Sequence, residues 1–334
     1  MLAENIDGLR CPKCGGALDW NVSRREGGRI LTADVTCGEC GAGYCVKDGI
    51  GMFLTPELQR NDLWESSRTG LEEYLSRNPD VERELLETPL EDMSPVDLHY
   101  RGVALRRRGR TEEAERASRA ASEGMYGPQR DRCLKEQLDF VVSEVRRRGE
   151  PVLDLASGEG TLARRLALET DVSLTVSDFS PSVLRRDLEW FSEEEGGGGV
   201  SLMAFDARRT PFADGSIPFM TSCLGLQNIE EPGSLLKELR RVVSGIFMSV
   251  SQFYPEDDTE NGKLIREYGL ERLMYRDRCL EEFRRAGWSA VTVNECFAEE
   301  VPPPPGRILR GARVDALPAC PTTLLWCVVI AEPA

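Results

Sequence analysis

Four cysteines near the start of the 334-residue chain have the spacing of a metal site. Cys11 and Cys14 form one Cys-x-x-Cys pair, and Cys37 and Cys40 form a second pair beyond the strand-like stretch RILTADVT. Four thiolates from two such pairs bind one zinc ion tetrahedrally. We predict a structural rather than a catalytic zinc site, because a closed four-thiolate shell leaves no open position for water. Two redox dithiols are the alternative, although a redox pair would not need a twin.

A glycine turn further along the chain has the form of a ligand-binding element. The stretch PVLDLASGEGTLARRL, residues 151–166, has the pattern of a short apolar strand, a glycine turn and a helix. Gly158 and Gly160 let the backbone approach a ligand at the N-terminus of that helix. Their spacing alone also fits a dinucleotide fingerprint and does not decide between ligands.

Two carboxylates favour a cationic ligand over a pyrophosphate. Asp154 lies inside the strand, four residues before Gly158, where it would repel phosphate and attract an ammonium group. Asp178 ends the next strand, VSLTVSDFS, in position to accept hydrogen bonds from both hydroxyls of a ribose. S-adenosylmethionine combines an ammonium group, a sulfonium charge and a ribose, and it is therefore the predicted cofactor. Strand, helix and strand together form a βαβ unit.

The composition limits the classes of partner. The 42 basic and 57 acidic residues give a net charge of −15, which repels nucleic acid unless basic residues cluster. The two basic runs, Arg106–Arg108 and Arg146–Arg148, are read as solvated helix faces, with an RNA contact as the alternative. The sequence has neither an export signal nor about 18 consecutive apolar residues, so we expect a cytoplasmic protein without a membrane partner.

The region from about residue 120 onward resembles the class I, Rossmann-like S-adenosylmethionine-dependent methyltransferases. DLASGEG stands in place of that family's D-x-G-x-G-x-G motif, with Ala156 at the first glycine. The resemblance implies an α/β fold with a seven-stranded sheet, helices on both faces and an antiparallel closing pair. It also implies that Asp206 and the amide of Ala207 hold the adenine, with Phe205 or Phe179 beside the base. The full set of implied cofactor-binding residues is Asp154, Ala156, Ser157, Gly158, Gly160, Asp178, Phe179, Asp206, Ala207 and Cys223.

The first 57 residues resemble the small zinc-ribbon proteins that activate tRNA, rRNA and release-factor methyltransferases. The two cysteine pairs, a following aromatic residue and VKDGIGMFL carry this resemblance. It implies a methyltransferase neighbour, here in the same chain. Cys45, next to the second pair, is expected to be a core thiol rather than a fifth ligand.

Changes in composition predict three parts. We expect a β-rich zinc-ribbon domain at 1–58, a helical connector at 59–122 and the methyltransferase domain at 123–334. An insertion at about 254–280 is expected to cover the substrate. A stripe of small residues in the connector should pack closely on a neighbour; the stripe is Ala114, Ala117 and Ala121.

No residue is assigned to catalysis, because methyl transfer depends chiefly on alignment and the exclusion of water. The candidates near the transferred methyl group are Cys223, Gln227, Asn228, His99 and Tyr126. For His99, the only histidine, and for Tyr126, simple packing is the alternative. An oxygen or amide nucleophile would need a base, and the acids proposed for that role are Asp206, Glu230 and Glu231.

Three functions remain open at this stage. A small-molecule methyltransferase is favoured by the acidic balance and the insertion. An RNA methyltransferase whose zinc ribbon grips the substrate is the first alternative, and a non-catalytic partner-binding protein is the second. The later cysteines raise arsenite as a substrate, with buried core thiols as the more ordinary explanation; these cysteines are Cys133, Cys223, Cys279, Cys296, Cys320 and Cys327. No oligomeric state follows from the sequence.

Overall fold

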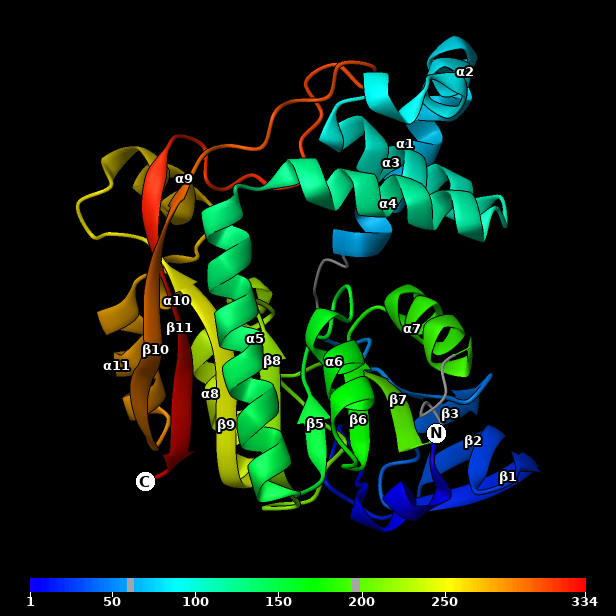
Figure 1. The fold of residues 1–334 in the computed structure, drawn as a ribbon. Coiled ribbons are helices and arrows are strands. Elements are labelled where there is room, and N and C mark those ends of the chain that lie inside the picture. Colours follow the sequence, from blue (N-terminus) through cyan, green and yellow to red (C-terminus); the bar gives the residue numbers. More distant parts are fainter. Residues whose placement is uncertain (59–62, 194–198) are drawn as a thin grey trace.

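The computed structural model describes residues 1–58, 63–193 and 199–334. The strands are β1 (Leu18–Glu26), β2 (Arg29–Cys37), β3 (Gly43–Lys47), β4 (Ile50–Phe53), β5 (Val152–Asp154), β6 (Leu174–Asp178), β7 (Val200–Phe205), β8 (Ile217–Cys223), β9 (Val243–Phe253), β10 (Trp288–Glu300) and β11 (Thr322–Pro333). Within the described residues they form one eleven-stranded sheet, in the order β1-β2-β3-β4-β7-β6-β5-β8-β9-β11-β10 (Figure 1).

Helices fill most of the remaining chain. The α-helices are α1 (Leu63–Arg77), α2 (Pro79–Glu87), α3 (Pro95–Arg107), α4 (Thr111–Met125), α5 (Pro128–Arg148), α6 (Thr161–Glu169), α7 (Pro181–Glu193), α8 (Pro232–Val242), α9 (Thr259–Glu267), α10 (Glu271–Met274) and α11 (Arg276–Arg285). Short 3-10 helices are η1 (Ala3–Gly8), η2 (Leu90–Asp92) and η4 (Leu226–Asn228). In the described ranges no helix is both long and apolar enough to cross a bilayer.

Seven of the strands have the expected arrangement. Strands β7, β6, β5, β8 and β9 are parallel neighbours, and β11 lies antiparallel between β9 and β10. The strand order reverses at β5, so the carboxyl ends of β5 and β8 flank a switch point, where ligands bind in open α/β sheets. Side chains alternate across β5, with Val152 packed against α5, α6 and α7, and Leu153 packed with α8 and α11.

The expected number of strands is wrong, because the described residues form a sheet of eleven strands rather than seven. Strand β4 pairs in parallel with β7, with Ile50 opposite Leu202 and Phe53 opposite Phe205. Ile50 and Phe53 are fully buried. By pairing with β7, this short apolar strand covers an edge of the sheet that would otherwise expose unpaired backbone groups. The cysteine-bearing segment thus continues the sheet with four more strands.

Helices α1–α4 form a group that we call the cap, at the top of Figure 1. As expected, the connector is helical and its three alanines are buried. Close packing of α3 on α4 requires Gly102, since a Cβ there would lie 2.6 Å from the hydroxyl of Ser118. The expected domain boundaries stay predictions; the one at residue 58 adjoins 59–62, outside the described residues.

Residues 301–321, which we call the strap, run from β10 to the cap and back to β11 (Figure 1). Asp97 of α3 is fully buried and accepts hydrogen bonds from the backbone N–H groups of Arg307, at 2.8 Å, and Leu309, at 2.9 Å. Ser94 donates a further hydrogen bond of 2.6 Å. Burial acts to raise the pKa of Asp97, but these hydrogen bonds outweigh it and lower the pKa overall.

Replacing Asp97 tests whether the strap fastens the cap. Asp97→Ala should lower the free energy of unfolding by about 2–4 kcal/mol, because buried N–H groups lose their acceptor. Since the folded-state pKa is lowered, this stability is present above the pKa of the unfolded state and is lost as the pH falls through the folded value. Urea unfolding with Asp92→Ala, an exposed neighbour, as the control measures the difference. Equal stability of the two variants would contradict the assignment.

Candidate functional site

The glycine turn joins β5 to α6 in the expected way. Gly158 and Gly160 have φ angles of +54° and +74°, in the left-handed region that favours glycine. Ala156 has a φ of +53°, so an alanine adopts the conformation for which the methyltransferase motif has glycine. Gly225 lies against it, because a Cβ there would be 2.7 Å from the carbonyl oxygen of Ala156.

Asp178, at the end of β6, contacts this turn directly. Its Oδ2 accepts a 3.0 Å hydrogen bond from the backbone N–H of Gly158, and its Oδ1 accepts one of 2.8 Å from Ser180. The neighbouring Phe179 is half-buried. The structure therefore brings the second carboxylate to the turn, as the strand-end positions predict.

Asp154, the carboxylate inside β5, is buried with 1% of its surface exposed. Thr221 of β8 donates a 2.7 Å hydrogen bond to its Oδ1. Burial raises the pKa of Asp154 to about 7, and the negative charges of Asp187 and Asp178 act in the same direction. A cation bound beside Asp154 would favour its ionised form.

Asp187 of α7 is a site carboxylate that the sequence analysis missed. It is fully buried, with Arg164 and Arg186 each 3.8 Å from its Oδ1, and burial raises its pKa to about 6. Arg186 also donates a hydrogen bond to the carbonyl oxygen of Gly158, so a side chain of α7 contacts the glycine turn. The sequence does contain a signal for this site, because Asp187 is a carboxylate within the apolar face of α7, between Leu184 and Phe191.

The segment after β7 is an ion-pair network. Asp206 is fully buried, and Arg208 donates to both of its carboxylate oxygens, including 2.9 Å from Nη2 to Oδ2. Arg208 also pairs with Glu231 at 2.7 Å and with Glu230 at 3.5 Å. All three acids considered as bases are therefore held by one guanidinium. Ala207 is buried beside them.

Cys223 ends β8 on the same face of the sheet as Asp154. Burial, followed by the negative charge of Asp154, raises the pKa of its thiol to about 12, so Cys223 is a neutral thiol at neutral pH. Gln227 in η4 is buried, whereas Asn228 is exposed and donates to the carbonyl of Leu224 at 3.3 Å.

Tyr126 and His99 lie where the cap meets the sheet. The hydroxyl of Tyr126 donates to Asp315 of the strap, and the guanidinium of Arg130 lies 3.4 Å from the centroid of its ring. Burial lowers the pKa of His99, while the charges of Glu159 in the glycine turn and of Asp315 oppose this shift. Tyr126 thus contacts the strap, and His99 packs against Tyr100 with ring centroids 5.2 Å apart.

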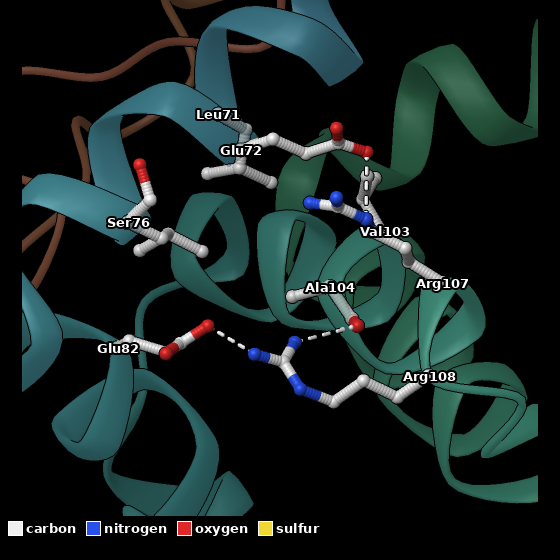
Figure 2. Close-up of a pocket in the computed structure, with 9 residues that line it drawn as sticks. Leu71, Glu72, Ser76, Glu82, Val103, Ala104, Arg107 and Arg108 are labelled. Atoms are coloured by element: carbon white, nitrogen blue, oxygen red, sulfur yellow. Dashed lines mark hydrogen bonds and ion pairs between the residues drawn. The ribbon is translucent and has the colours of Figure 1, made fainter.

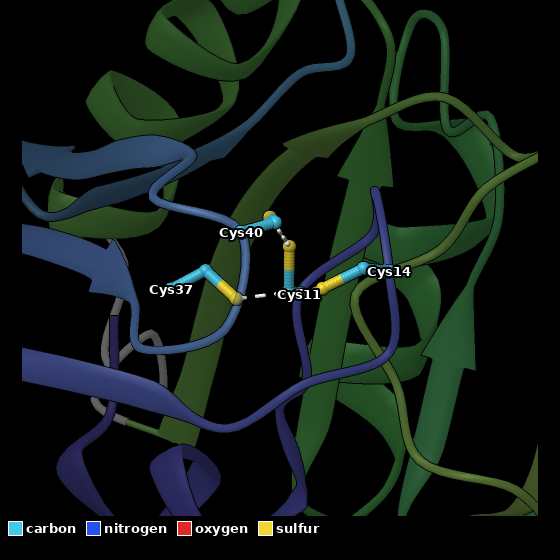
Figure 3. Close-up of side chains that lie close together, drawn as sticks. All are labelled: Cys11, Cys14, Cys37 and Cys40. Atoms are coloured by element: carbon cyan, nitrogen blue, oxygen red, sulfur yellow. Dashed lines mark hydrogen bonds between the residues drawn. The ribbon is translucent and has the colours of Figure 1, made fainter.

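The four cysteines converge as predicted (Figure 3). Their Sγ atoms lie within 4.8 Å of one another, with 3.7 Å between Cys11 and Cys40 and 3.5 Å between Cys14 and Cys37. Sulfurs 2.3 Å from one tetrahedral zinc ion would be about 3.8 Å apart, so the cluster fits zinc. Backbone N–H groups of residues 40 and 39 lower the pKa of the Cys37 thiol to about 7, which favours the thiolate. Half-buried Cys45 lies outside the cluster.

The later cysteines do not form a three-thiol site. Cys133 of α5 and Cys296 of β10, expected as separate thiols, form a disulfide with their Cα atoms 6.1 Å apart. Cys279 and Cys327 are buried core residues. Among the described residues, the N-terminal cluster is the one group of three or more potential metal ligands. This removes the structural support for arsenite as a substrate.

The basic runs are paired with acids. Figure 2 shows a pocket of about 170 Å³ within the cap, where Arg107 pairs with Glu72 at 3.0 Å and Arg108 pairs with Glu82. Arg147 of the second run pairs with Glu144 at 2.6 Å. These pairs support the interpretation of Arg107, Arg108 and Arg147 as solvated residues, whereas Arg106 and Arg148 are half-buried.

Residues 152–245 match the family model of the methyltransferase domain. The matched region runs from β5 into β9 and contains the glycine turn, both strand-end carboxylates, Asp206 and Cys223. The match supports a methyltransferase. The cap, the strap and the four-cysteine cluster lie outside the matched methyltransferase region.

Curated relatives agree with this match over part of their length. The ubiquinone/menaquinone biosynthesis C-methyltransferase UbiE of Geotalea uraniireducens (strain Rf4) is 29% identical over 107 residues, which are 31% of this chain and 46% of that protein. The demethylmenaquinone methyltransferase of Thermobifida fusca (strain YX) is 37% identical over 97 residues, 28% of this chain and 39% of that protein. The chain thus spans less than half the length of these relatives.

Among solved structures, the YcgJ protein of Bacillus subtilis superposes with a TM-score of 0.46 at 15% sequence identity. The superposition covers 60% of this chain and 99% of that one.

The raised pKa of Asp154 predicts a pH-dependent affinity for S-adenosylhomocysteine. Because the ionised carboxylate attracts the ammonium group, calorimetry should show affinity rising about tenfold from pH 6 to pH 8, through the pKa near 7. Asp154→Asn should abolish this rise, whereas Asp171→Asn, an exposed control, should keep it. A pH-independent affinity in the unaltered protein would contradict the role of Asp154.

The left-handed backbone at Ala156 predicts a stabilising substitution. Ala156→Gly should raise the free energy of unfolding by about 0.5–1 kcal/mol, because glycine adopts this φ without steric cost. Ala167→Gly, within α6, is the matched control and should lower stability by about 1 kcal/mol. Thermal unfolding of the two variants measures these opposite changes in stability. Destabilisation by both substitutions would contradict the strain assigned to Ala156.

Proposed function

We propose that the chain is an S-adenosylmethionine-dependent methyltransferase that acts on a small molecule and contains a structural zinc site. One observation supports this proposal above all: Asp154, Asp178 and the glycine turn lie together within the matched methyltransferase domain. Buried carboxylates at this switch point attract a cationic cofactor and repel a diphosphate.

Particular groups would hold each end of the cofactor. Asp154 would face the ammonium group, directly or through water, and Gly158 would let the backbone approach closely. Asp178, which already contacts the glycine turn through its Oδ2, would accept hydrogen bonds from the ribose hydroxyls. The segment of Asp206 and Ala207 would hold the adenine.

Phe179 is the better candidate for the residue beside the adenine ring. It is half-buried next to Asp178, whereas Phe205 packs in the core with its ring centroid 5.5 Å from that of Phe212. A ring already enclosed by the core has no free face for a base.

The chain's own contribution to catalysis is alignment and the exclusion of water. The cap and the strap lie at the carboxyl ends of the parallel strands, where β10 ends and β11 begins. Cys223 would line the reacting end as a neutral thiol, and its high pKa argues against a role as a nucleophile. Bound S-adenosylmethionine would supply an activated methyl group.

Several observations favour a small-molecule substrate over RNA. The net charge is −15, and Arg107, Arg108 and Arg147 of the two arginine runs are engaged by glutamates. The two relatives named above carry quinone-pathway names, so a ring compound of that kind is the first substrate to test. The four cysteines would stabilise the sheet extension, because four-thiolate zinc sites are structural.

Transfer of label from S-adenosylmethionine tests the proposed function. S-adenosylhomocysteine should raise the thermal midpoint of unfolding, and label from S-adenosylmethionine should enter small molecules of a fractionated cell extract. Asp178→Asn should weaken S-adenosylhomocysteine binding by about 10–100-fold, since charge-assisted hydrogen bonds are lost. Asp171→Asn is the exposed control. Label in RNA would favour the RNA alternative, and no thermal shift would favour a non-catalytic partner-binding protein.

A further inference from the structure

An arginine near the reacting end lacks hydrogen-bonding partners. The side chain of Arg130, in the first turn of α5, has 13% of its surface exposed. Its nearest carboxylate oxygen, on Glu300, is 3.8 Å from its Nε, which is too long for a hydrogen bond. Within residues 1–58, 63–193 and 199–334 its guanidinium donates no hydrogen bond. Its charge is balanced by Glu300 and by the Tyr126 ring, and its five N–H donors remain available to an oxygen acceptor.

A second donor without a partner lies on the same face of the sheet. Tyr254 directly follows β9 and is 4% exposed, and its buried hydroxyl has no hydrogen-bond partner in the part of the chain that the structure describes. Gln252, two residues earlier on the same face, has a buried Oε1 that also lacks a partner. Buried polar groups are normally satisfied, so two such groups at one strand end point to a ligand.

Aromatic rings and a fixed helix end surround Arg130. Its guanidinium lies 3.4 Å from the ring centroid of Tyr126 and 5.4 Å from that of Trp326. Trp326 is opposite Gln252 in the register of β11 and β9 and donates a 2.9 Å hydrogen bond to Glu300. The start of α5 is fastened to β10, because the side chain of Gln129 accepts the N–H of residue 299 at 2.8 Å.

Arg130 also adjoins the cofactor end of the site. Besides burial, Asp154 and Arg130 are the two charges that shift the pKa of the Cys223 thiol. On its other side Arg130 pairs with Glu300 at 3.8 Å. Asp315, a further acid near Glu300, accepts a hydrogen bond from the hydroxyl of Tyr126.

We propose that Arg130 and Tyr254 bind an anionic oxygen of the methyl acceptor, as in a phenolate or an enolate. This inference rests on the proposed function and adds the substrate class to it. The guanidinium and the Tyr254 hydroxyl are donors and suit an oxygen acceptor, whereas the unpaired Oε1 of Gln252 is an acceptor and suits a donor group, such as a second hydroxyl, on the same molecule. A guanidinium beside the oxygen lowers the pKa of the acceptor's hydroxyl and so supplies the nucleophile.

Charge and protons balance in the transfer that follows. Formation of the oxyanion releases the hydroxyl proton to Glu300, the nearest carboxylate to Arg130. The acceptor then forms a bond to the methyl carbon while the bond from that carbon to sulfur breaks and leaves its electron pair on sulfur. Methylation of the oxygen gives an ether directly, whereas methylation of the conjugated carbon also releases that carbon's proton and restores the hydroxyl.

4-Nitrophenol is a direct probe, because its phenolate absorbs visible light and its phenol does not. In protein saturated with S-adenosylhomocysteine, the bound probe should ionise about one pH unit lower than the free probe. Arg130→Leu should remove this shift and weaken binding about tenfold, and Tyr254→Phe should weaken binding a few-fold. Arg132→Leu, on the exposed side of the same helix, is the matched control and should change neither.

A second measurement does not depend on the probe. Arg130→Leu should keep the affinity for S-adenosylhomocysteine within about twofold and lower label transfer into extract metabolites at least about tenfold. Arg130→Lys, which keeps the charge, should recover part of the transfer. An unchanged transfer rate in Arg130→Leu would overturn the inference, as would tighter binding of 4-nitroaniline, a shape analogue without the hydroxyl, than of 4-nitrophenol.

The two proposals fail in distinguishable ways. If the protein binds S-adenosylhomocysteine but Arg130→Leu behaves like Arg132→Leu in both measurements, the acceptor subsite is wrong and the methyltransferase proposal stands. If the unaltered protein does not bind S-adenosylhomocysteine, the proposed function fails and the acceptor subsite fails with it.

Discussion

Three carboxylates buried around one backbone turn are the constraint on which this site depends. Asp154, Asp178 and Asp187 all approach the turn between β5 and α6, and burying a charge costs several kcal/mol unless a partner compensates. Backbone N–H groups hold Asp178, and two guanidiniums stand near Asp187. For Asp154 the hydrogen bond from Thr221 does not offset burial, so its pKa is raised to about 7 and an imbalance remains. A cationic ligand would relieve that imbalance.

The rest of the molecule brings distant segments to this turn. The cap is held to the strap by Asp97, whose partners are more than 200 residues away in the chain. The strap in turn engages Tyr126 through Asp315, and α5 meets the end of β10 through Gln129. The proposed acceptor subsite therefore combines residues at the ends of α5, β9, β10 and β11, which are far apart in the sequence.

Local patterns predicted the parts of the fold that depend on local chemistry. The cysteine pairs, the glycine turn, the strand-end acids and the helical connector could all be recognised from spacing and periodicity. The pairing of β4 with β7 could not, because a four-residue strand matched to a partner about 150 residues later leaves no local signal. For the same reason the hydrogen bonds between the strap and Asp97 of α3 could not be predicted. Asp187 and the pairing of Asp206 with Arg208 were missed because each depends on tertiary neighbours, and the roles proposed for the cofactor residues stay predictions.

The junction between β4 and β7 limits how this chain can be divided. A fragment that started after residue 58 would present β7 as a bare edge, with Phe205 and its neighbours uncovered on one side. Such an edge is a template for self-association, so the fragment would tend to aggregate even if every residue of the glycine turn were present. Expression of the matched region alone would therefore give a misleading picture of its solubility.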